Sequence, residues 1–387
     1  MPPDAPNNQP IDRLLDRLVD ALKHRNDPQG AVQKWLRRVK RLSLWLTAAY
    51  VVALFAILAG MEYCGEKHWL TSFLMFLPPQ GWLVPLAFLT PWCLLFNRRA
   101  CWLHLICVLW VGLVYMNPQW SRQLAPNGPT IKVLTNNIGQ HGSKGPTDLI
   151  RTEDPDIIVL QEAGRGPQFA RTFTNYSVAA HSEFTLLSKF PIKSSAHLPI
   201  RSIFNEPVAA RFELDCHGQT LVVYNIHFTS PRRELESLRG LGFLAALFGR
   251  EGGHGRKVRK LNADFWKRQL EDVDAVMEHI RKETHPVLIA GDFNSPDHGV
   301  IYHRFAREWT DAFDARGRGF GFTFPGFTRN PLTLFGPWLR LDYVYSGKEL
   351  VPLHCHTEAD RRSQHRGVVA TFEFKPLEGN TKKGAVE

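Results

Sequence analysis

Residues 287–294 read VLIAGDFN, a run of four apolar residues followed by Gly, Asp, Phe and Asn. A short apolar run bounded by turn-forming residues is typical of a strand that is buried on both faces. Asp292 and Asn294 then stand where this strand ends. The stretch predicts a central strand of a sheet with polar side chains at its carboxyl end.

Similar runs recur through the carboxyl-terminal two thirds of the chain. They are IKVLT (131–135), DIIVL (156–160), FTLLS (184–188), VAARFEL (208–214), TLVVYNI (220–226), PVLIA (286–290), LDYVY (341–345) and VVATFEF (368–374). A helix is predicted over about 264–282, where apolar residues follow helical spacing. Many strands with few helices favour a sheet-on-sheet α/β arrangement, and the chain contains no GxGxxG or Walker loop.

Polar groups follow several of these strands. Asn137, Glu162 and Asp292 come after three of the runs, and Asn225 and His227 end another. Asp342 begins LDYVY, and His365 precedes the last strand. Carboxylate and amide oxygens suit a hard divalent cation such as Mg²⁺, which needs only one or two protein carboxylates. A His held by an Asp supplies a positioned cationic donor.

Each of these residues also has a structural interpretation when it is taken alone. Asn294 could form an Asx turn, Asp342 could be a buried salt-bridge partner, and His227 could be a hydrogen-bonded core histidine. Their occurrence together and in this order indicates a catalytic site.

The order of the motifs resembles the endonuclease/exonuclease/phosphatase superfamily, the deoxyribonuclease-I-like fold. The resemblance covers about 130–375 and is carried by TNNIG, LQEA, LLSKFPI, YNIHFTSP, GDFN, LRLDYVY and SQHRG. GDFN and the NxH phrase are the most specific of these. The resemblance implies a four-layer α/β sandwich, in which two packed β-sheets are flanked by helices.

The resemblance also implies roles for the site residues. Glu162 would be the principal metal ligand, supported by Asn137. Asp292 would orient the attacking water and Asn294 would donate to the phosphoryl oxygen. His365, oriented by Asp342, would contact the scissile phosphate. His227 would lie near the leaving group, Asn225 would fix the local hydrogen bonds, and Arg211 would be either a phosphate contact or a structural arginine.

One position departs from the family pattern. The family has Ser-Asp-His where this chain has Ser363-Gln364-His365. The neutral Gln364 removes a carboxylate from beside the metal, so weaker metal binding is expected. Gln364 also leaves open the alternative that the chain is a catalytically weakened, membrane-tethered binding module.

The amino-terminal third is apolar. Residues 42–60 contain no charge over 19 positions, which is enough to cross a bilayer as a helix. Two further stretches, about 78–96 and 100–116, predict three spans in all. Between them they contain one histidine, His104, for which a packed or hydrogen-bonded role is expected.

Charge placement predicts the orientation of these spans. Lys34, Arg37, Arg38, Lys40 and Arg41 precede the first span, and Arg98 and Arg99 lie between the second and third. Basic residues favour the cytoplasmic side. With three spans, the carboxyl-terminal domain is predicted to lie outside the cytoplasm, in the periplasm or the extracellular space. The protein is then expected to be integral to the inner membrane.

The expected organisation follows from these segments. It comprises a cytoplasmic segment 1–41 with an amphipathic helix at 11–22, a transmembrane region 42–117, a linker 118–130, a catalytic domain 131–375 and a tail 376–387. The segment 232–262 has two interpretations: an apolar lid that enters the bilayer beside basic residues, or a buried helix and a solvated loop. Cys216 and Cys355 could form a disulfide, but spacing does not decide this.

The function expected from the sequence is hydrolysis of a phosphodiester or phosphomonoester with Mg²⁺, or Mn²⁺, at a membrane. A lipid-linked or phospholipid-type substrate is slightly favoured. A nuclease is the second hypothesis, although the net charge of +10 divides evenly: residues 1–117 carry 12 Lys and Arg against 7 Asp and Glu, and the rest carry 35 against 30. The domain's surplus of +5 is small for a protein that binds nucleic acid.

Overall fold

The computed structural model describes residues 28–139, 145–164, 166–250, 252–326, 333, 336–359 and 363–375. The amphipathic helix expected at 11–22 and the tail 376–387 lie outside these residues. The described residues fall into two compact units. The first comprises those within Met1–Ala56 and Gln80–Val111, and the second those within Ile57–Pro79 and Gly112–Glu387.

The first unit is helical. Its long helices are α2 (Pro28–Tyr63, of which residues up to Ala56 belong here), α4 (Val84–Phe96) and α5 (Cys101–Leu109). Three helical segments are long and apolar enough to cross a membrane, namely Gly30–Tyr63, Pro79–Phe96 and Arg98–Tyr115. They overlap the three stretches expected from the sequence. The first helix begins well before residue 42, so its basic residues are helical too.

A group of polar side chains is buried among the apolar residues of this unit. His104 is buried, and its two ring nitrogens lie 3.1 Å from Thr47 Oγ1 and 3.0 Å from Thr90 Oγ1. Trp92 Nε1 donates to Ser43 Oγ at 2.9 Å. These contacts join α2, α4 and α5 through hydrogen bonds, which agrees with the expected hydrogen-bonded role of His104.

The second unit contains two six-stranded sheets. The strand orders are β10-β12-β9-β8-β7-β6 and β13-β14-β2-β3-β5-β4. The first sheet consists of β6 (Ile192–His197), β7 (Ala209–Cys216), β8 (Gln219–His227), β9 (Val287–Asp292), β10 (Thr310–Asp311) and β12 (Asp342–Ser346). The second consists of β2 (Thr130–Asn137), β3 (Ile157–Gln161), β4 (Ser177–His181), β5 (Phe184–Ser188), β13 (Leu350–Thr357) and β14 (Val368–Phe374). A separate ribbon pairs β1 (Gln119–Trp120) with β11 (Arg318–Gly319).

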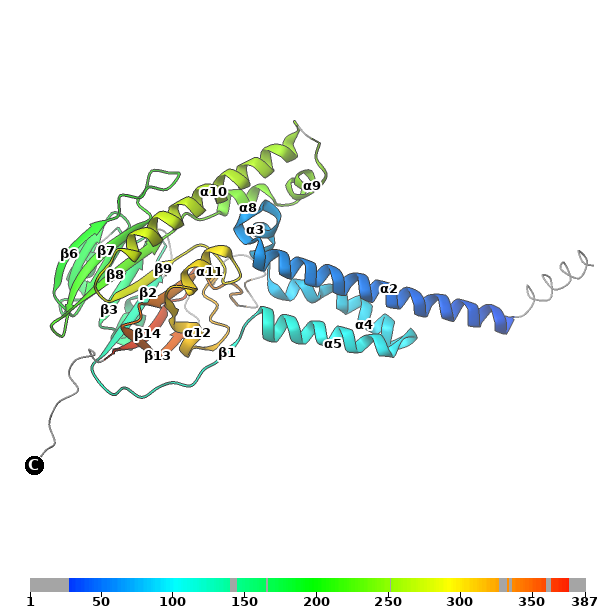
Figure 1. Cartoon of the computed structure of the whole chain (residues 1–387), viewed down its shortest axis with the longest axis horizontal. Coiled ribbons are helices and arrows are strands. Elements are labelled where there is room, and N and C mark those ends of the chain that lie inside the picture. The colour runs from blue at the N-terminus through cyan, green and yellow to red at the C-terminus, as the bar shows by residue number, and fades with distance from the viewer. Residues whose placement is uncertain are drawn as a thin grey trace, which may run out of the picture. The chain divides into compact units, whose positions relative to one another are not determined.

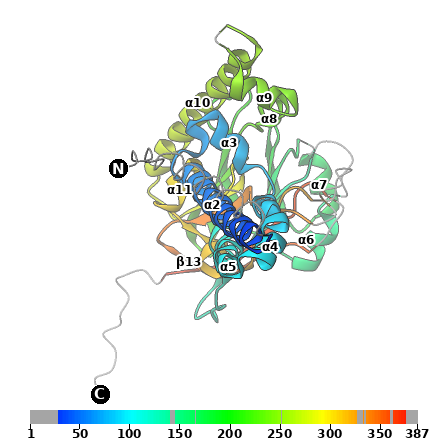
Figure 2. The same ribbon diagram turned by 90° about the vertical axis from the view of Figure 1, so that its right-hand side faces the viewer.

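Helices cover the outer faces of both sheets. Trp266, Val273 and Met277 of α10 (His254–Arg281) pack on the β6–β12 sheet, together with α11 (Val300–Ala306). On the other sheet lie α6 (Thr147–Glu153) and α7 (Gly166–Thr172). Figure 1 shows α10 along β6 to β9, and Figure 2 shows α6 and α7 on the side away from α10. The predicted four-layer α/β sandwich is confirmed.

The middle core lies between the two sheets. Val133, Val159 and Leu186 from one sheet meet Phe212 and Leu288 from the other, all fully buried. Cys216 and Cys355 belong to this cluster as buried free thiols. No disulfide joins them in this structure, and both side chains fill apolar space in the core.

The segment 232–262 differs from both expectations in part. It forms α8 (Arg232–Ser237), α9 (Leu241–Phe248) and the first part of α10, which begins at His254 and not near 264. The buried-helix interpretation is wrong for α9, because most of its large side chains are exposed. The remaining α-helices among the described residues are α3 (Trp69–Met75) and α12 (Ala312–Arg316), and short 3-10 or π-helical segments lie at Gly65–Lys67, Pro79–Leu83, Arg98–Ala100 and Trp110–Tyr115.

Candidate active site

The predicted site residues converge because of strand direction. β2 runs parallel to β3, and β8 runs parallel to β9. The carboxyl ends of parallel neighbours meet at one edge of a sheet. Within the second pair His227 is opposite Asp292, and the antiparallel β12 brings Asp342 opposite Asp292 as well. β2 of the second sheet contacts β9 of the first, so the end of β2 lies near the same cluster.

Asp292 lies at the centre of the cluster. Its Oδ2 accepts a hydrogen bond from Asn137 Nδ2 at 3.0 Å, and its Oδ1 accepts one from the backbone N–H of Asn294 at 2.9 Å. The same Oδ2 lies 3.8 Å from His227 Nε2 and 3.7 Å from His365 Nε2. Burial raises the pKa of Asp292, and the nearby Asp342 carboxylate raises it further.

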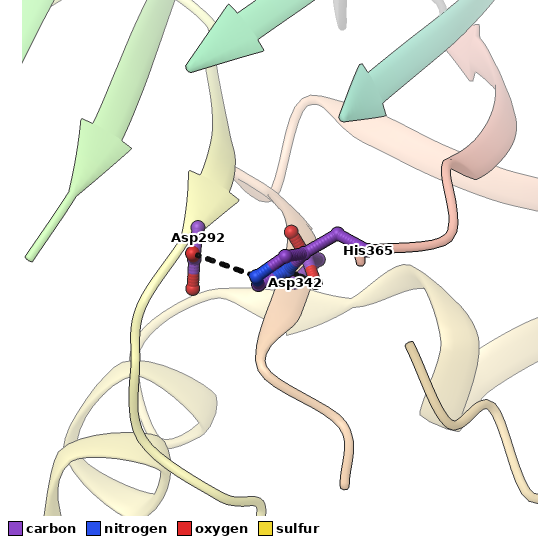
Figure 3. Close-up of side chains that lie close together, drawn as sticks. All are labelled: Asp292, Asp342 and His365. Atoms are coloured by element: carbon purple, nitrogen blue, oxygen red, sulfur yellow. Dashed lines mark hydrogen bonds and ion pairs between the residues drawn. The ribbon is translucent and has the colours of Figure 1, made fainter. Parts of the chain in front are cut away.

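His365 is held by Asp342. Its Nδ1 lies 2.9 Å from Asp342 Oδ2, and Figure 3 shows its ring directed toward Asp292. Burial alone would lower the pKa of His365, but the charges of Asp342 and Asp292 raise it to about 9. The Phe324 ring lies 4.8 Å from the imidazole, centroid to centroid. The imidazole is therefore positioned as a cationic donor at neutral pH.

His227 forms a second pair of the same kind. Its Nδ1 lies 3.0 Å from Glu183 Oε1, and Nε2 faces Asp292. Burial opposes the charged imidazole, but Glu183 and then Asp292 raise the pKa of His227 to about 9. Two histidine side chains thus face one buried carboxylate, His227 from the end of β8 and His365 from the loop before β14.

Glu162 reaches the cluster through Asn137. The Asn137 amide donates to Glu162 Oε1 at 3.1 Å as well as to Asp292, so one side chain spaces the two carboxylates. Glu162 has a φ of +53°, which is uncommon for a residue with a side chain. Backbone strain of this kind is often found at functional sites.

Two asparagines fix the surrounding backbone. The buried Asn225 accepts from Gln161 Nε2 at 2.7 Å and donates to Leu160 O at 2.8 Å, which ties β8 to β3 across the sandwich. Asn294, with a φ of +49°, donates from its amide to Phe228 O at 2.8 Å. The expected donation from Asn294 to a phosphoryl oxygen stays a prediction.

Two of the residues singled out in the sequence, Arg211 and Gln364, have no hydrogen bond or ion pair with the cluster in the part of the chain that the structure describes. Arg211 is bound by carboxylates, with Nη2 at 2.8 Å from Glu283 and Nη1 at 3.2 Å from Glu213. These ion pairs favour its structural interpretation over a phosphate contact. Gln364 is exposed, and its backbone carbonyl oxygen accepts a hydrogen bond from the backbone N–H of Gly326 at 2.6 Å. Its proximity to a bound metal stays a prediction.

Three supporting residues were not predicted. Glu183 orients His227, and Thr323 Oγ1 accepts from the N–H groups of Leu341 and Asp342 at 3.1 and 3.3 Å. Glu66 is fully buried, accepts from the Ser295 hydroxyl and accepts from Val300 N at 2.6 Å. Each lies far along the chain from its partner and in no recognised motif, so no local pattern marks it.

The residues present fit a divalent cation. Asp292, Asp342 and His365 can bring ligand atoms within 4.8 Å of one another, and Glu162 adds a carboxylate through Asn137. Asp342 Oδ1 is buried and has no hydrogen-bond partner among the described residues. Such a group costs free energy unless water or a cation satisfies it. His365 contacts only Oδ2 of Asp342, so the Oδ1 atom of Asp342 could serve as a ligand for a hard ion together with the oxygens of Glu162 and Asp292.

Several solved structures are similar to this chain. An endonuclease/exonuclease/phosphatase from Beutenbergia cavernae is 16% identical with a TM-score of 0.43, and the match covers 65% of this chain and 72% of the other. A mannosyl-6-phosphatase from Bacteroides thetaiotaomicron is 14% identical with a TM-score of 0.45, covering 63% and 100%. A humanized D. rerio TDP2 is 14% identical with a TM-score of 0.44, covering 63% and 99%.

No curated protein sequence matches significantly. The model of the endonuclease/exonuclease/phosphatase family matches residues 147–365, which is more than half of the 387 residues. The matched segment includes Glu162, His227, Asp292, Asp342 and His365. The chain therefore belongs to the endonuclease/exonuclease/phosphatase family.

Proposed function

We propose that this chain is a membrane-anchored, Mg²⁺-dependent phosphoesterase whose catalytic domain lies outside the cytoplasm. Family members are usually phosphoester hydrolases and generally use a divalent metal. The observation that carries the proposal is the pair of buried histidines, His227 and His365, whose Nε2 atoms lie 3.8 and 3.7 Å from Asp292 Oδ2. Each is held by a second carboxylate on its other nitrogen.

This arrangement suits a reaction in which negative charge grows on phosphoryl oxygens. Two preorganised cationic donors stabilise that charge most in a site that excludes water. Asp292 accepts hydrogen bonds and can orient the attacking water by accepting one from it. A bound Mg²⁺ would neutralise phosphoryl charge and lower the pKa of a coordinated water. Glu162 would hold the ion, with Asn137 fixing the carboxylate.

The membrane part of the proposal is supported by α2 and the two shorter candidate spans. Lys34, Arg37, Arg38, Lys40 and Arg41 flank the first apolar run, and Arg98 and Arg99 separate the other two. With basic residues inside, an odd number of spans places the catalytic domain outside.

Anchoring favours a substrate that is itself in the membrane. A lipid-linked phosphate or a phospholipid would reach a tethered enzyme by diffusion in two dimensions. A deoxyribonuclease binds many backbone phosphates, whereas the part of the chain after residue 117 carries a surplus of only +5. We therefore favour the lipid over nucleic acid.

The substrate is tested by a screen of the purified full chain in detergent, with Mg²⁺ or Mn²⁺. The substrates are a chromogenic phosphodiester, a phosphomonoester, isoprenoid phosphates, phospholipids and plasmid DNA. Turnover of a membrane phosphoester in preference to DNA is expected. Preferred cleavage of DNA would replace the lipid hypothesis with a nuclease, and failure of every substrate would indicate a binding module.

The orientation is tested with reporters fused after Gly379. Alkaline phosphatase should be active there, and a reporter that requires the cytoplasm should be inactive. The reverse pair of results would place the domain in the cytoplasm and contradict a three-span topology.

A further inference from the structure

Helix α9 has an exposed apolar face, defined here by Leu241, Leu244, Leu247 and Phe248. Leu241 is 82% exposed and Phe248 is 77% exposed. Large apolar side chains gathered on one short helix are unfavourable in water and commonly mark an interaction surface. These four side chains do not contribute to the core, because the buried residue of α9 is Ala246.

The helix is fixed in this position by close backbone packing. A Cβ atom on Gly255 of α10 would lie 1.9 Å from the carbonyl oxygen of Ala245, so the two helices approach too closely for any other residue. Arg259 Nη1 donates to Ala246 O at 2.5 Å. The apolar face is therefore held outward by the packing of α9 on α10 and does not turn toward the core.

On another side, α9 packs against α3, the helix that follows the first candidate span in the sequence. Phe243 packs on Phe73 and Trp69 of α3, with ring centroids 5.4 and 6.3 Å apart. Figures 1 and 2 both show α3 beside α8 and α9. The span ends at Tyr63 and α3 begins at Trp69, so five residues separate them and can extend by about 18 Å at most. All of these residues belong to the second unit.

Basic residues flank α9 in the sequence and lie in the first turn of α10, which packs on α9. Arg239, Arg250, Arg256 and Lys257, here called the basic collar, are all exposed. Residues 239–260 contain six Lys and Arg against one acidic residue, Glu251. An apolar helix face bordered by cationic side chains is the pattern of a helix that lies in a membrane interface. The charge of the collar is complementary to the phosphates of anionic lipids.

We propose that α9 is an interfacial helix, which inserts its apolar face into the leaflet from which the first span emerges while the basic collar contacts lipid phosphates. The proposal rests on the membrane anchoring proposed above. It adds a non-covalent attachment, through which α9 holds the catalytic domain against the lipid surface, to the covalent connections between the domain and the spans.

The test is photo-cross-linking of the full chain reconstituted into vesicles of phosphatidylcholine and phosphatidylglycerol. A p-benzoylphenylalanine replaces one residue at a time: Phe248 on α9, Trp45 in the first span, or Phe204. Phe204 is the matched control, because it is an aromatic residue that is 58% exposed in the β6–β7 connection. That connection reaches α10 at Arg268, ten residues or about 15 Å beyond the Val258 that packs near α9.

Lipid adducts should form at positions 45 and 248, and position 248 should exceed position 204 by about tenfold, which corresponds to ~1.4 kcal/mol in partitioning. Labelling at 45 but only background at 248 would overturn the interfacial helix and leave the anchoring intact. Background at both 45 and 248 would overturn the anchoring. Equal labelling at 204 and 248 would also contradict the proposal, because the lipid contact would not be specific to α9.

The basic collar is tested separately with Arg256→Glu combined with Lys257→Glu. In vesicles that contain phosphatidylglycerol, labelling at position 248 should fall several-fold in this variant. In vesicles of phosphatidylcholine alone it should change little. Unchanged labelling in both kinds of vesicle would contradict the role of the collar.

Discussion

The helices of the first unit bury polar side chains beside apolar ones, whereas the space between the sheets of the second unit is filled by apolar side chains. In the first unit Trp45 and Phe88 are about three quarters exposed, at 74% and 76%, while Ser43, Thr47 and His104 are buried. In the sandwich the space between the sheets is filled by apolar residues such as Phe212 and Leu288. A helix that exposes apolar residues and hydrogen-bonds internally is suited to lipid, where helices associate through small and polar groups.

The candidate active site is a part of the sandwich where charged side chains are buried. Asp292, Asp342 and His365 are all buried there, next to the apolar core. Burying charged groups is unfavourable unless they are paired or bind metal. The comparison teaches that buried polar groups join helices in one unit and serve chemistry in the other, and substitutions in each should separate the two effects.

The largest expected effect is that of Glu162→Gln. Loss of the carboxylate removes the predicted main ligand, so divalent-dependent hydrolysis should fall by about 10³-fold or more, since a bound metal supplies several kcal/mol of transition-state stabilisation. Initial rates with saturating Mg²⁺ measure this. Glu206→Gln, at an exposed carboxylate, is the matched control and should keep full activity. Undiminished hydrolysis by the Glu162 variant would show that the ligand is misassigned.

Asp342→Asn should give the next largest effect. The amide no longer stabilises the charged, correctly oriented His365, so kcat should fall by about 10²-fold or more. Tyr345→Phe is the control on the same strand, because the Tyr345 hydroxyl has no hydrogen-bond partner among the described residues. It should be nearly neutral. Equal losses in both variants would mean that β12 tolerates no substitution, and that Asp342 has no special role.

Gln364→Asp should act on metal affinity more than on turnover. If residue 364 lies beside the cation, the added carboxylate should lower the half-saturating Mg²⁺ concentration about tenfold, or ~1.4 kcal/mol. Metal titrations at two substrate concentrations distinguish this from repulsion of an anionic substrate, which would raise the Michaelis constant. An unchanged affinity in both titrations would place Gln364 away from the ion.

The smallest effect is expected in the helical unit, from His104→Leu. The change removes two hydrogen bonds between helices, each worth about 0.6 kcal/mol in a membrane. The thermal unfolding temperature in detergent should fall slightly, with kcat unchanged. Leu105→Ala, on the exposed face of the same helix, is the control. A large loss of hydrolysis in the His104 variant would break the separation between the two units.

The sequence predicted the interior of both sheets but not their edges. The eight predicted strands correspond to β2, β3, β5, β7, β8, β9, β12 and β14, which are the interior strands of the two six-stranded sheets. The missed members, β4, β6, β10 and β13, are the edge strands. Interior strands are buried on both faces and read as apolar runs, whereas an edge such as IKSSAH is polar because it meets water.

The site shows the same division. The positions of Asp292, Asp342 and His365 were predicted because each lies at the end of an apolar strand or in a family motif. Glu183, Thr323 and Glu66 were not, because each acts through hydrogen bonds to residues that are distant in sequence. Contacts of this kind depend on tertiary packing, and no local periodicity records them. The beginning of α10 at His254 was missed for a related reason, since its first turns are basic and contain Gly255.

The most direct test of the central claim is the metal dependence of hydrolysis by the full chain. The protein is purified in detergent, stripped with a chelator, and assayed on a chromogenic phosphodiester and on isoprenoid phosphates while Mg²⁺ is added back. No turnover is expected after stripping, and full turnover should return with Mg²⁺ in the wild type but not in Glu162→Gln. Turnover that survives complete removal of divalent ions would contradict the account.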